Sequence, residues 1–309
     1  MKILCITSID HIPNVKKNLE LLGNCCILSK VNEQTVVEYL SNNDIDTIFT
    51  NPNKQGFILG EKTLQGITRI ITASTGLNHI DMKYCNNNNI EVTSITTDYD
   101  MLRQIPSTAE HTFGLMMSLI RNIPKSFDSV KQGNWDWEPF IGKQICDLSV
   151  GIVGYGRLGT MMAKYCNAFD ADVLVCDPYN KAFQYYNTKL DWMFANVDVI
   201  SLHVHVNDET KYMINDDIIN KATKPVYIIN TSRGEIVDES AIIRGFENGK
   251  IAGYATDVLE HEFDDISKSP IIQNIDKYNI IVTPHLGGST IGAQQIAYNR
   301  VINIAKDTK

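Results

Sequence analysis

Three polar segments carry the residue types that acid–base chemistry on an anionic substrate requires. Arg233 lies in TSRGEIVD, Asp257 lies in ATDVLEHE with two glutamates, and His285 lies in TPHLGG. A histidine exchanges a proton near neutral pH, and a neighbouring carboxylate orients its ring. An arginine binds a carboxylate through two parallel hydrogen bonds and stabilises charge on a carbonyl oxygen. With a bound hydride donor, these parts suffice to reduce a 2-keto acid.

Each of these segments follows an apolar run that is typical of a buried strand, namely PVYII, IAGYAT and NIIV. Ligands of open α/β sheets bind beyond the carboxyl ends of the strands. We therefore expect Arg233, Asp257, Glu262 and His285 to face one crevice. The residues alone leave open whether Glu260 or Glu262 is the carboxylate partner of His285.

A glycine-rich loop in a strand–loop–helix context predicts a dinucleotide site. The apolar run 149–153 leads into GYGRLG, a helix is expected over 157–169, and Asp177 follows the next strand, 18 positions after Gly159. Gly154 allows a tight turn, Gly156 lets the backbone approach a pyrophosphate, and Gly159 lets the helix pack closely. The predicted loop contacts are Gly154, Tyr155, Gly156, Arg157, Leu158 and Gly159.

Asp177 is expected to accept hydrogen bonds from the adenine-ribose hydroxyls and to repel a 2′-phosphate. We therefore predict NAD as the cofactor rather than NADP, although Lys181 lies close by in the sequence. No metal site is predicted.

The elements around these segments alternate between short apolar runs and amphipathic stretches, a pattern that predicts parallel α/β sheets. Helices are expected at 32–42, 57–66, 107–121, 157–169, 215–222, 239–248 and from about 290 onward. Pro124 is expected to kink or break the helix that begins near Ser107. Strands are expected at 2–7, 25–29, 46–50, 67–73, 90–95, 148–154, 171–176, 197–204, 225–232, 251–258 and 279–285.

The bulk composition excludes several classes of protein. The 309 residues are 43% hydrophobic and 21% charged, which fits a globular chain of two domains. A net charge of −8 disfavours binding to nucleic acid or to an anionic membrane. No apolar run is long enough to cross a membrane. The seven cysteines lack C-x-x-C spacing and predict reduced thiols in a cytoplasmic protein.

The glycine loop and the three polar segments, in this order, resemble the D-isomer-specific 2-hydroxyacid dehydrogenase family, with phosphoglycerate dehydrogenase-like features, over essentially the whole chain. The resemblance implies two doubly wound domains with the active site between them. The substrate domain, 1–101 with 288–309, is the smaller, discontinuous and flavodoxin-like one, and 102–287 form the Rossmann NAD domain. The resemblance also implies a homodimer in which the helix near 107–121 contributes to the interface. Trp135 and Trp137 are expected to pack at an interdomain or dimer surface.

The resemblance assigns roles position by position. His285 is implied as the acid/base, Glu262 as its partner and Arg233 as the clamp on the substrate carboxylate. Asp257 is implied to lie near the nicotinamide. A loop whose backbone amides hold the substrate is implied at Ser74, Thr75 and Gly76. Further cofactor contacts are implied at His203, Thr210, Thr231 and Ser232, in a chain that reads LHVH where the family has LHxP. The remaining histidines, His11, His79, His111, His205 and His261, are expected to be structural.

The expected activity is therefore NAD-dependent interconversion of a D-2-hydroxy acid and its 2-keto acid. A narrower alternative is a D-3-phosphoglycerate dehydrogenase, for which Lys54 is a candidate phosphate contact. An alternative of another class is an NAD-sensing binding protein of the same fold, which binds the dinucleotide without turnover. Nothing in the sequence identifies the substrate beyond its carboxylate.

Overall fold

The structure is a computed structural model that describes residues 1–28, 30–52, 56–180 and 184–308. The chain divides into two compact units. Unit 1 consists of Met1–Ile105 and Gly288–Lys309, and unit 2 consists of Pro106–Gly287. The first division thus lies after Ile105, whereas the sequence-based expectation ended the first segment at residue 101.

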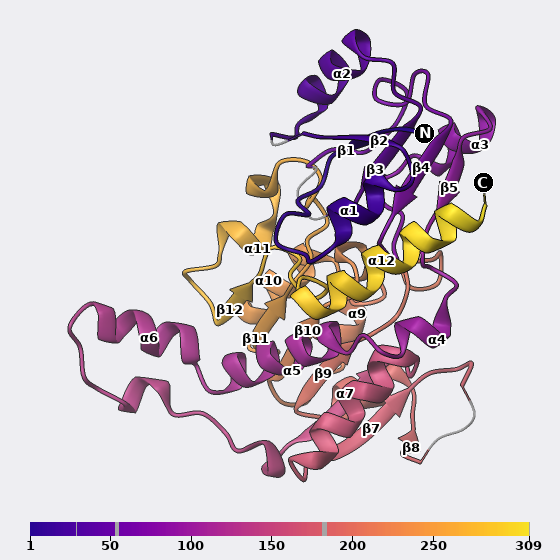
Figure 1. Ribbon diagram of the computed structural model, residues 1–309. Coiled ribbons are helices and arrows are strands. Elements are labelled where there is room, and N and C mark those ends of the chain that lie inside the picture. Colours follow the sequence, from indigo (N-terminus) through magenta and orange to yellow (C-terminus); the bar gives the residue numbers. More distant parts are fainter. Residues whose placement is uncertain (29, 53–55, 181–183, 309) are drawn as a thin grey trace. The chain divides into compact units, whose positions relative to one another are not determined.

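Unit 1 is built on a five-stranded parallel sheet with the strand order β2-β1-β3-β4-β5 (Figure 1). This strand order is flavodoxin-like, as the family resemblance implied for this domain. The strands are β1 (Lys2–Cys5), β2 (Asn24–Ile27), β3 (Thr47–Thr50), β4 (Arg69–Thr72) and β5 (Glu91–Thr93). The helices are α1 (Val15–Glu20), α2 (Glu33–Asn42), α3 (Met82–Asn87), α4 (Tyr99–Leu102) and α12 (Ile291–Asp307).

The inner strands β1, β3 and β4 are buried on both faces, which explains why apolar residues dominate them, whereas the edge strands β2 and β5 are partly exposed. Ile3 and Cys5 of β1 point into one cluster with α1 and α12, and Leu4 points into the other with α2 and α3. The C-terminal helix α12 packs beside α1 and against β4 and β5 (Figure 1). The last residues of the chain therefore complete the core of the unit that the first residues begin.

Unit 2 contains a seven-stranded parallel sheet with the order β12-β11-β10-β9-β6-β7-β8. Its strands are β6 (Ser149–Val153), β7 (Asp172–Cys176), β8 (Tyr186–Asn187), β9 (Val199–Leu202), β10 (Val226–Asn230), β11 (Ile251–Thr256) and β12 (Ile280–Val282). Its α-helices are α5 (Ser107–Ile120), α6 (Ile123–Lys131), α7 (Arg157–Ala168), α8 (Leu190–Asn196), α9 (Asp216–Ile219), α10 (Glu239–Glu247) and α11 (Pro270–Gln273). Short 3-10 turns are η2 (Glu138–Phe140), η3 (Ile145–Asp147), η4 (Gly234–Ile236) and η5 (Ile266–Lys268).

The direction of winding in unit 2 reverses next to β6. From β6 the chain proceeds outward through β7 to β8, and from β9 it proceeds the other way to β12. Ligands of doubly wound sheets bind where this reversal opens a crevice at the carboxyl ends of the strands. The glycine loop directly follows β6, so it lies at this switch point.

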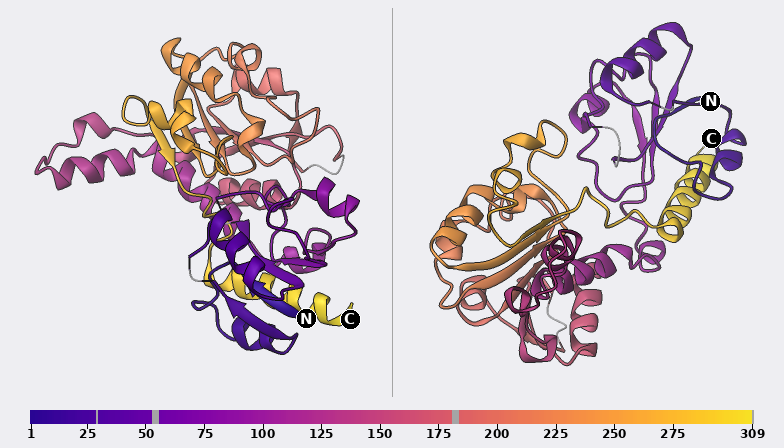
Figure 2. Two further views of the ribbon diagram at one scale, coloured as in Figure 1. Left: turned by 90° about the horizontal axis from the view of Figure 1, so that it is seen from above. Right: turned by 90° about the vertical axis from the view of Figure 1, so that its left-hand side faces the viewer.

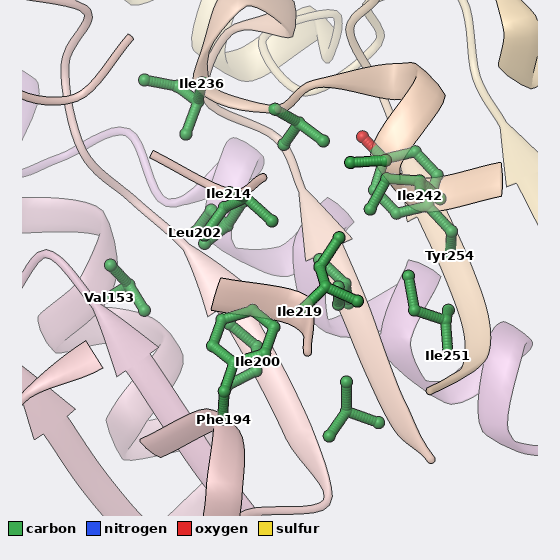
Figure 3. Close-up of a cluster of buried hydrophobic side chains, with 14 of the residues drawn as sticks. Val153, Phe194, Ile200, Leu202, Ile214, Ile219, Ile236, Ile242, Ile251 and Tyr254 are labelled. Carbon is green, nitrogen blue, oxygen red and sulfur yellow. The ribbon is translucent and has the colours of Figure 1, made fainter. Parts of the chain in front are cut away.

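A cluster of buried hydrophobic side chains packs between one face of the larger sheet and its helices (Figure 3). Phe194 of α8, Ile242 of α10 and Tyr254 of β11 are almost completely buried there. A packed core of this kind leaves little freedom to the strands, so the loops at their carboxyl ends start from rigid supports.

Helix α6 and the loop after it project away from the sheet of unit 2 (Figures 1 and 2). The helix α5 ends at Ile120, Asn122 adopts φ 52°, and α6 begins at Ile123 with Pro124 in its first turn. The predicted break at Pro124 is therefore confirmed. The first turn of α6 accommodates the proline because an N–H group there would have no intrahelical acceptor.

One predicted helix is wrong. Residues 57–66 form turns instead, because Leu59 is extended and makes a parallel bridge with Ile80. Gly66 has φ 77°, which also ends any helical run. The two-residue strand β8 was not predicted. None of the helices in the described part of the chain has the length and apolarity that a membrane crossing requires.

Candidate active site

The three polar segments lie side by side at the carboxyl edge of the larger sheet. The strands β10, β11 and β12 are neighbours, with Asn230 paired to Thr256 and Thr256 paired to Val282. Beyond the strands, Asp257 N–H donates to the Asn230 carbonyl at 2.9 Å, and Thr283 N–H donates to the Thr256 carbonyl at 2.9 Å. The backbone thus carries the segments of Arg233, Asp257 and His285 into one place.

His285 and Glu262 form a hydrogen-bonded pair. His285 Nδ1 lies 3.0 Å from Glu262 Oε2, and their side chains are 29% and 17% exposed. A carboxylate can only accept, so Nδ1 carries the proton in this contact and Nε2 is left to exchange protons with another group. Glu260 instead accepts a hydrogen bond from the Tyr212 hydroxyl. The structure therefore resolves the choice of His285's partner in favour of Glu262.

The backbone of His285 is in the left-handed region, with φ 55°. A non-glycine residue held in such a conformation costs about 1–3 kcal/mol, which the surroundings must offset. The His285 N–H donates to the Asp257 carbonyl at 3.0 Å, and the N–H groups of Leu286 and Gly287 donate to the Asp257 carboxylate at 2.7 and 2.8 Å. Asp257 therefore holds the turn that presents the His285 ring.

The Asp257 carboxylate is almost completely buried, at 2% exposure, yet it stays ionised. Burial alone would raise its pKa, but hydrogen bonds from His111, Thr283 and the N–H groups of Leu286 and Gly287 outweigh burial and lower the pKa. The turn is therefore fixed by a charged carboxylate across the whole neutral range of pH.

Arg233 starts the turn after β10 and is only partly buried. Its Nη1 donates to the Ser232 carbonyl at 2.6 Å, and no carboxylate in the described part of the chain lies within ion-pair distance of its guanidinium. Gly234 allows this turn to press against the Glu262 loop, because a Cβ there would lie 2.1 Å from the Leu259 carbonyl carbon. Arg233 thus offers an uncompensated charge close to the loop that carries Glu262.

The glycine loop has the geometry that a pyrophosphate site needs. Gly154 has φ 88°, and a Cβ on Gly159 would lie 2.0 Å from the Gly154 carbonyl oxygen, so both glycines are required by the backbone. A Cβ on Gly156 would meet nothing within 4 Å, so this residue faces open space. Helix α7 begins directly after it, and the first N–H groups of a helix have no intrahelical acceptors and favour anions.

Asp177 is tied to the glycine loop. Its carboxylate accepts hydrogen bonds from the N–H groups of Tyr155, Tyr179 and Asn180 at 2.8, 2.9 and 3.1 Å. Each carboxylate oxygen has further lone pairs, so these bonds orient the group without exhausting it. Tyr155 itself is buried in the core, which leaves its backbone as the part of that residue that faces the loop.

Four side chains predicted as cofactor contacts make hydrogen bonds within the protein. Thr231 Oγ1 lies 2.7 Å from Thr112 Oγ1, and Ser232 Oγ donates to the Leu202 carbonyl at 2.7 Å. Thr210 Oγ1 donates to a backbone carbonyl of its own turn. His203 Nε2 lies 2.9 Å from Ser201 Oγ, and burial lowers its pKa to about 4, so its ring is neutral. These residues shape the loops chiefly through such internal bonds.

The predicted substrate loop of unit 1 is a tight turn after β4. Ser74 Oγ donates to the Gly76 carbonyl at 2.7 Å and lies 3.1 Å from Thr72 Oγ1, while Thr75 lies at a bend outside any strand or helix. These internal hydrogen bonds of the Ser74 side chain stabilise the turn. Lys54 and Lys181 lie outside the described residues.

Sequence reasoning missed two members of the site. His111 and Thr283 both contact the Asp257 carboxylate, at 3.2 and 2.5 Å. Thr283 was visible as the first residue of TPHLGG, but His111 lies on α5, and no local signal connected that helix with the turn. Among the described residues, no group of three or more His, Cys, Asp or Glu side chains is arranged to hold a metal ion.

Comparisons with known proteins agree with this geometry. Residues 113–287 match the family described as "D-isomer specific 2-hydroxyacid dehydrogenase, NAD binding domain". The chain is 38% identical to D-3-phosphoglycerate dehydrogenase of Bacillus subtilis over 61% of its own length. It is 32% identical to glyoxylate reductase of Thermofilum pendens, over 73% of this chain and 67% of that protein.

A solved structure also resembles the whole chain. The D-lactate dehydrogenase from Aquifex aeolicus, complexed with NAD and lactic acid, is 28% identical with a TM-score of 0.77, covering 99% of this chain and 94% of that one. The sequence match to D-3-phosphoglycerate dehydrogenase of Bacillus subtilis, by contrast, spans only 36% of that protein. The chain belongs to the D-isomer specific 2-hydroxyacid dehydrogenase family, and its unit 2 contains the family's NAD-binding domain.

Proposed function

We propose that this protein is an NAD-dependent D-2-hydroxyacid dehydrogenase that interconverts a small 2-hydroxy acid and its 2-keto acid. The observation that carries the proposal is the His285–Glu262 hydrogen bond at 3.0 Å, formed at the same sheet edge as Arg233. A histidine oriented by a carboxylate, at the same sheet edge as an arginine that has no acidic partner among the described residues, suits proton transfer to a substrate that carries a carboxylate.

Each residue has a defined part in the proposed reaction. NAD(H), when bound, supplies or accepts the hydride. In the direction of reduction, His285 Nε2 gives a proton to the forming alkoxide oxygen, and Glu262 keeps the ring in the tautomer and orientation for this transfer. Arg233 binds the substrate carboxylate and stabilises negative charge on the carbonyl oxygen. The loop of Ser74, Thr75 and Gly76 is proposed to hold the same carboxylate through its backbone amides.

The cofactor assignment rests on the residues of unit 2. The open space at Gly156 and the start of α7 fit a pyrophosphate, and the Asp177 carboxylate fits ribose hydroxyls. Asp257 is proposed to lie beside the nicotinamide. Backbone groups near His203, Thr210, Thr231 and Ser232 are proposed to line the rest of the dinucleotide, and the charge of Asp177 favours NAD over NADP.

A panel of keto acids tests the proposal directly. Purified protein is mixed with NADH or NADPH and with glyoxylate, hydroxypyruvate, pyruvate or 3-phosphohydroxypyruvate, and loss of the reduced cofactor is followed by absorbance. We expect turnover with NADH, less with NADPH, and oxidation of only the D-enantiomer in the reverse direction. A strong preference for the phosphorylated acid would identify the narrower phosphoglycerate-type activity. Tight NADH binding without turnover on any acid would contradict the enzyme and favour an NAD sensor.

We further propose that two copies of the chain form a homodimer through the projecting arm, which we define as residues 123–141. Ile123, Phe127 and Val130 follow each other at i, i+4 and i+7 on α6, and no residue of that helix is buried. Trp135 is 92% exposed and Trp137 is 71% exposed. Helix α5, by contrast, buries one face against its own unit, so we propose that the exposed apolar side chains of the arm form the main contact between the two copies.

The dimer is tested by placing a charge in this stripe. Replacing Phe127 with aspartate is expected to convert a dimer into a monomer in sedimentation velocity, because an unpaired carboxylate is costly in an apolar interface. Ile266→Asp is the matched control, since Ile266 is an exposed apolar residue of unit 2 outside the arm. A monomeric wild-type protein, or a Phe127→Asp protein that remains dimeric, would refute the assignment.

A cytoplasmic location is also proposed, because all seven cysteines are free thiols.

A further inference from the structure

One histidine outside the proposed catalytic pair faces the turn that carries His285. His111 lies in the second turn of α5, and its Nε2 is 3.0 Å from Thr283 Oγ1 and 3.2 Å from Asp257 Oδ1. Helix α5 packs against β10, β11 and β12, the three strands whose ends carry the site. His111 therefore approaches the site from the helix layer beneath it.

The hydrogen bonds around His111 fix which of its nitrogens is protonated. The Thr283 hydroxyl gives its single proton to Asp257 Oδ1 at 2.5 Å, and an ionised carboxylate has no proton to give. Both oxygens that face His111 Nε2 are consequently acceptors. His111 must present an N–H at Nε2, shared between Thr283 and Asp257.

This N–H completes the set of donors that holds Asp257. Asp257 Oδ1 accepts hydrogen bonds from the Thr283 hydroxyl and the Leu286 N–H, and Oδ2 accepts one from the Gly287 N–H. His111 Nε2–H is a further donor to Oδ1. The backbone carbonyl of the same aspartate accepts the N–H of His285, whose backbone has φ 55°. Rotation of the Asp257 side chain would release the N–H groups of Leu286 and Gly287, the two residues that follow His285 in the turn.

We propose that His111 is a positioning residue: its Nε2–H locks Asp257 and Thr283, and through them it keeps the His285 ring in place for proton transfer. The inference rests on the proposed function for its effect on turnover. Its effect on the turn is independent of any reaction, because the amide protons of Leu286 and Gly287 report directly on the Asp257 bonds.

Two substitutions separate the N–H from the bulk of the side chain. His111→Leu removes the donor and fills similar space, whereas His111→Gln keeps an N–H close to the position of Nε2. We expect His111→Leu to lower kcat by about 10–100-fold with little change in the Kd for NADH, since small misplacements of a reacting group have effects of this size. His111→Gln is expected to recover most of the loss.

Amide hydrogen exchange at Leu286 and Gly287 is the second readout. Exchange should accelerate in His111→Leu and stay near the wild-type rate in His111→Gln. Met117→Ala, which removes packing elsewhere on α5, controls for general destabilisation and should lower Tm without changing exchange at these two amides relative to their neighbours.

The outcomes distinguish the two proposals. An inactive wild-type protein overturns the proposed function, and the exchange measurement still decides the role of His111. If His111→Leu keeps wild-type exchange at Leu286 and Gly287, or if His111→Gln is as impaired as His111→Leu, the positioning role is wrong.

Discussion

Replacing His285 with glutamine is expected to lower kcat for keto-acid reduction by about 10²–10⁴-fold, while the Kd for NADH stays close to the wild-type value. Glutamine approximates the length of the ring and remains polar, but it cannot give up a proton near neutral pH. The hydride would then generate an alkoxide that no protein group neutralises. Steady-state kinetics and fluorescence titration with NADH measure the two quantities separately.

The matched control is the same substitution at His261, one residue before Glu262. His261 shares the loop with Glu262, but it is Glu262 that holds the His285 ring, so the kcat of the His261→Gln variant should stay near wild type. A His285→Gln protein with near-normal turnover would mean that another group, or water, delivers the proton. The acid–base assignment would then be wrong, although the family membership would stand.

The fold was predictable where burial dictates the sequence. Strands such as β9 and β10 are covered on both faces, so nearly every position must be apolar and the run is visible without structural knowledge. The strand β8 is only two exposed residues long and carries no such signal. The wrong helix at 57–66 is consistent with the i, i+7 spacing of Phe57 and Leu64, while the actual constraint on Leu59 is a bridge to Ile80, which is distant in sequence.

The candidate site likewise has parts that local sequence could predict and parts that it could not. The glycine loop could be predicted residue by residue, because its requirements are local: a positive φ at Gly154 and a close approach at Gly159. The pairing of His285 with Glu262 needed the family's spacing, since Glu260 fits equally well by local rules. Contacts from α5 could not be predicted, because His111 and Thr283 are 172 positions apart and only the packing of α5 on the sheet brings them together.

Asp257 shows why residue type alone underestimates a role. The family resemblance implied an acid near the nicotinamide, whereas in the structure the Asp257 carboxylate organises the backbone of the turn that carries His285. The two roles are compatible, since a carboxylate with several lone pairs can serve a turn and a ligand together. The left-handed φ of His285 is the physical reason why such an anchor is needed.

Replacing Arg233 with alanine is expected to lower kcat/KM by about 10²–10³-fold, with KM raised and kcat lowered together, because losing one partner of a charged hydrogen-bonded pair costs several kcal/mol. The guanidinium is proposed to bind the carboxylate in the ground state and to stabilise the carbonyl oxygen more strongly as its charge grows. The first contact contributes to KM and the second to kcat.

Two variants sharpen this test. Arg233→Lys keeps the charge but loses the fork that matches a carboxylate, so its kcat/KM should lie between those of wild type and the alanine variant. Arg244→Ala removes an arginine of α10 that pairs with Asp216 on the surface, and it should leave the kinetics unchanged. Added guanidinium ion should partly restore turnover in Arg233→Ala and in no other variant. An unchanged kcat/KM in Arg233→Ala would refute the clamp, because no other described residue of that turn offers a cation to the substrate.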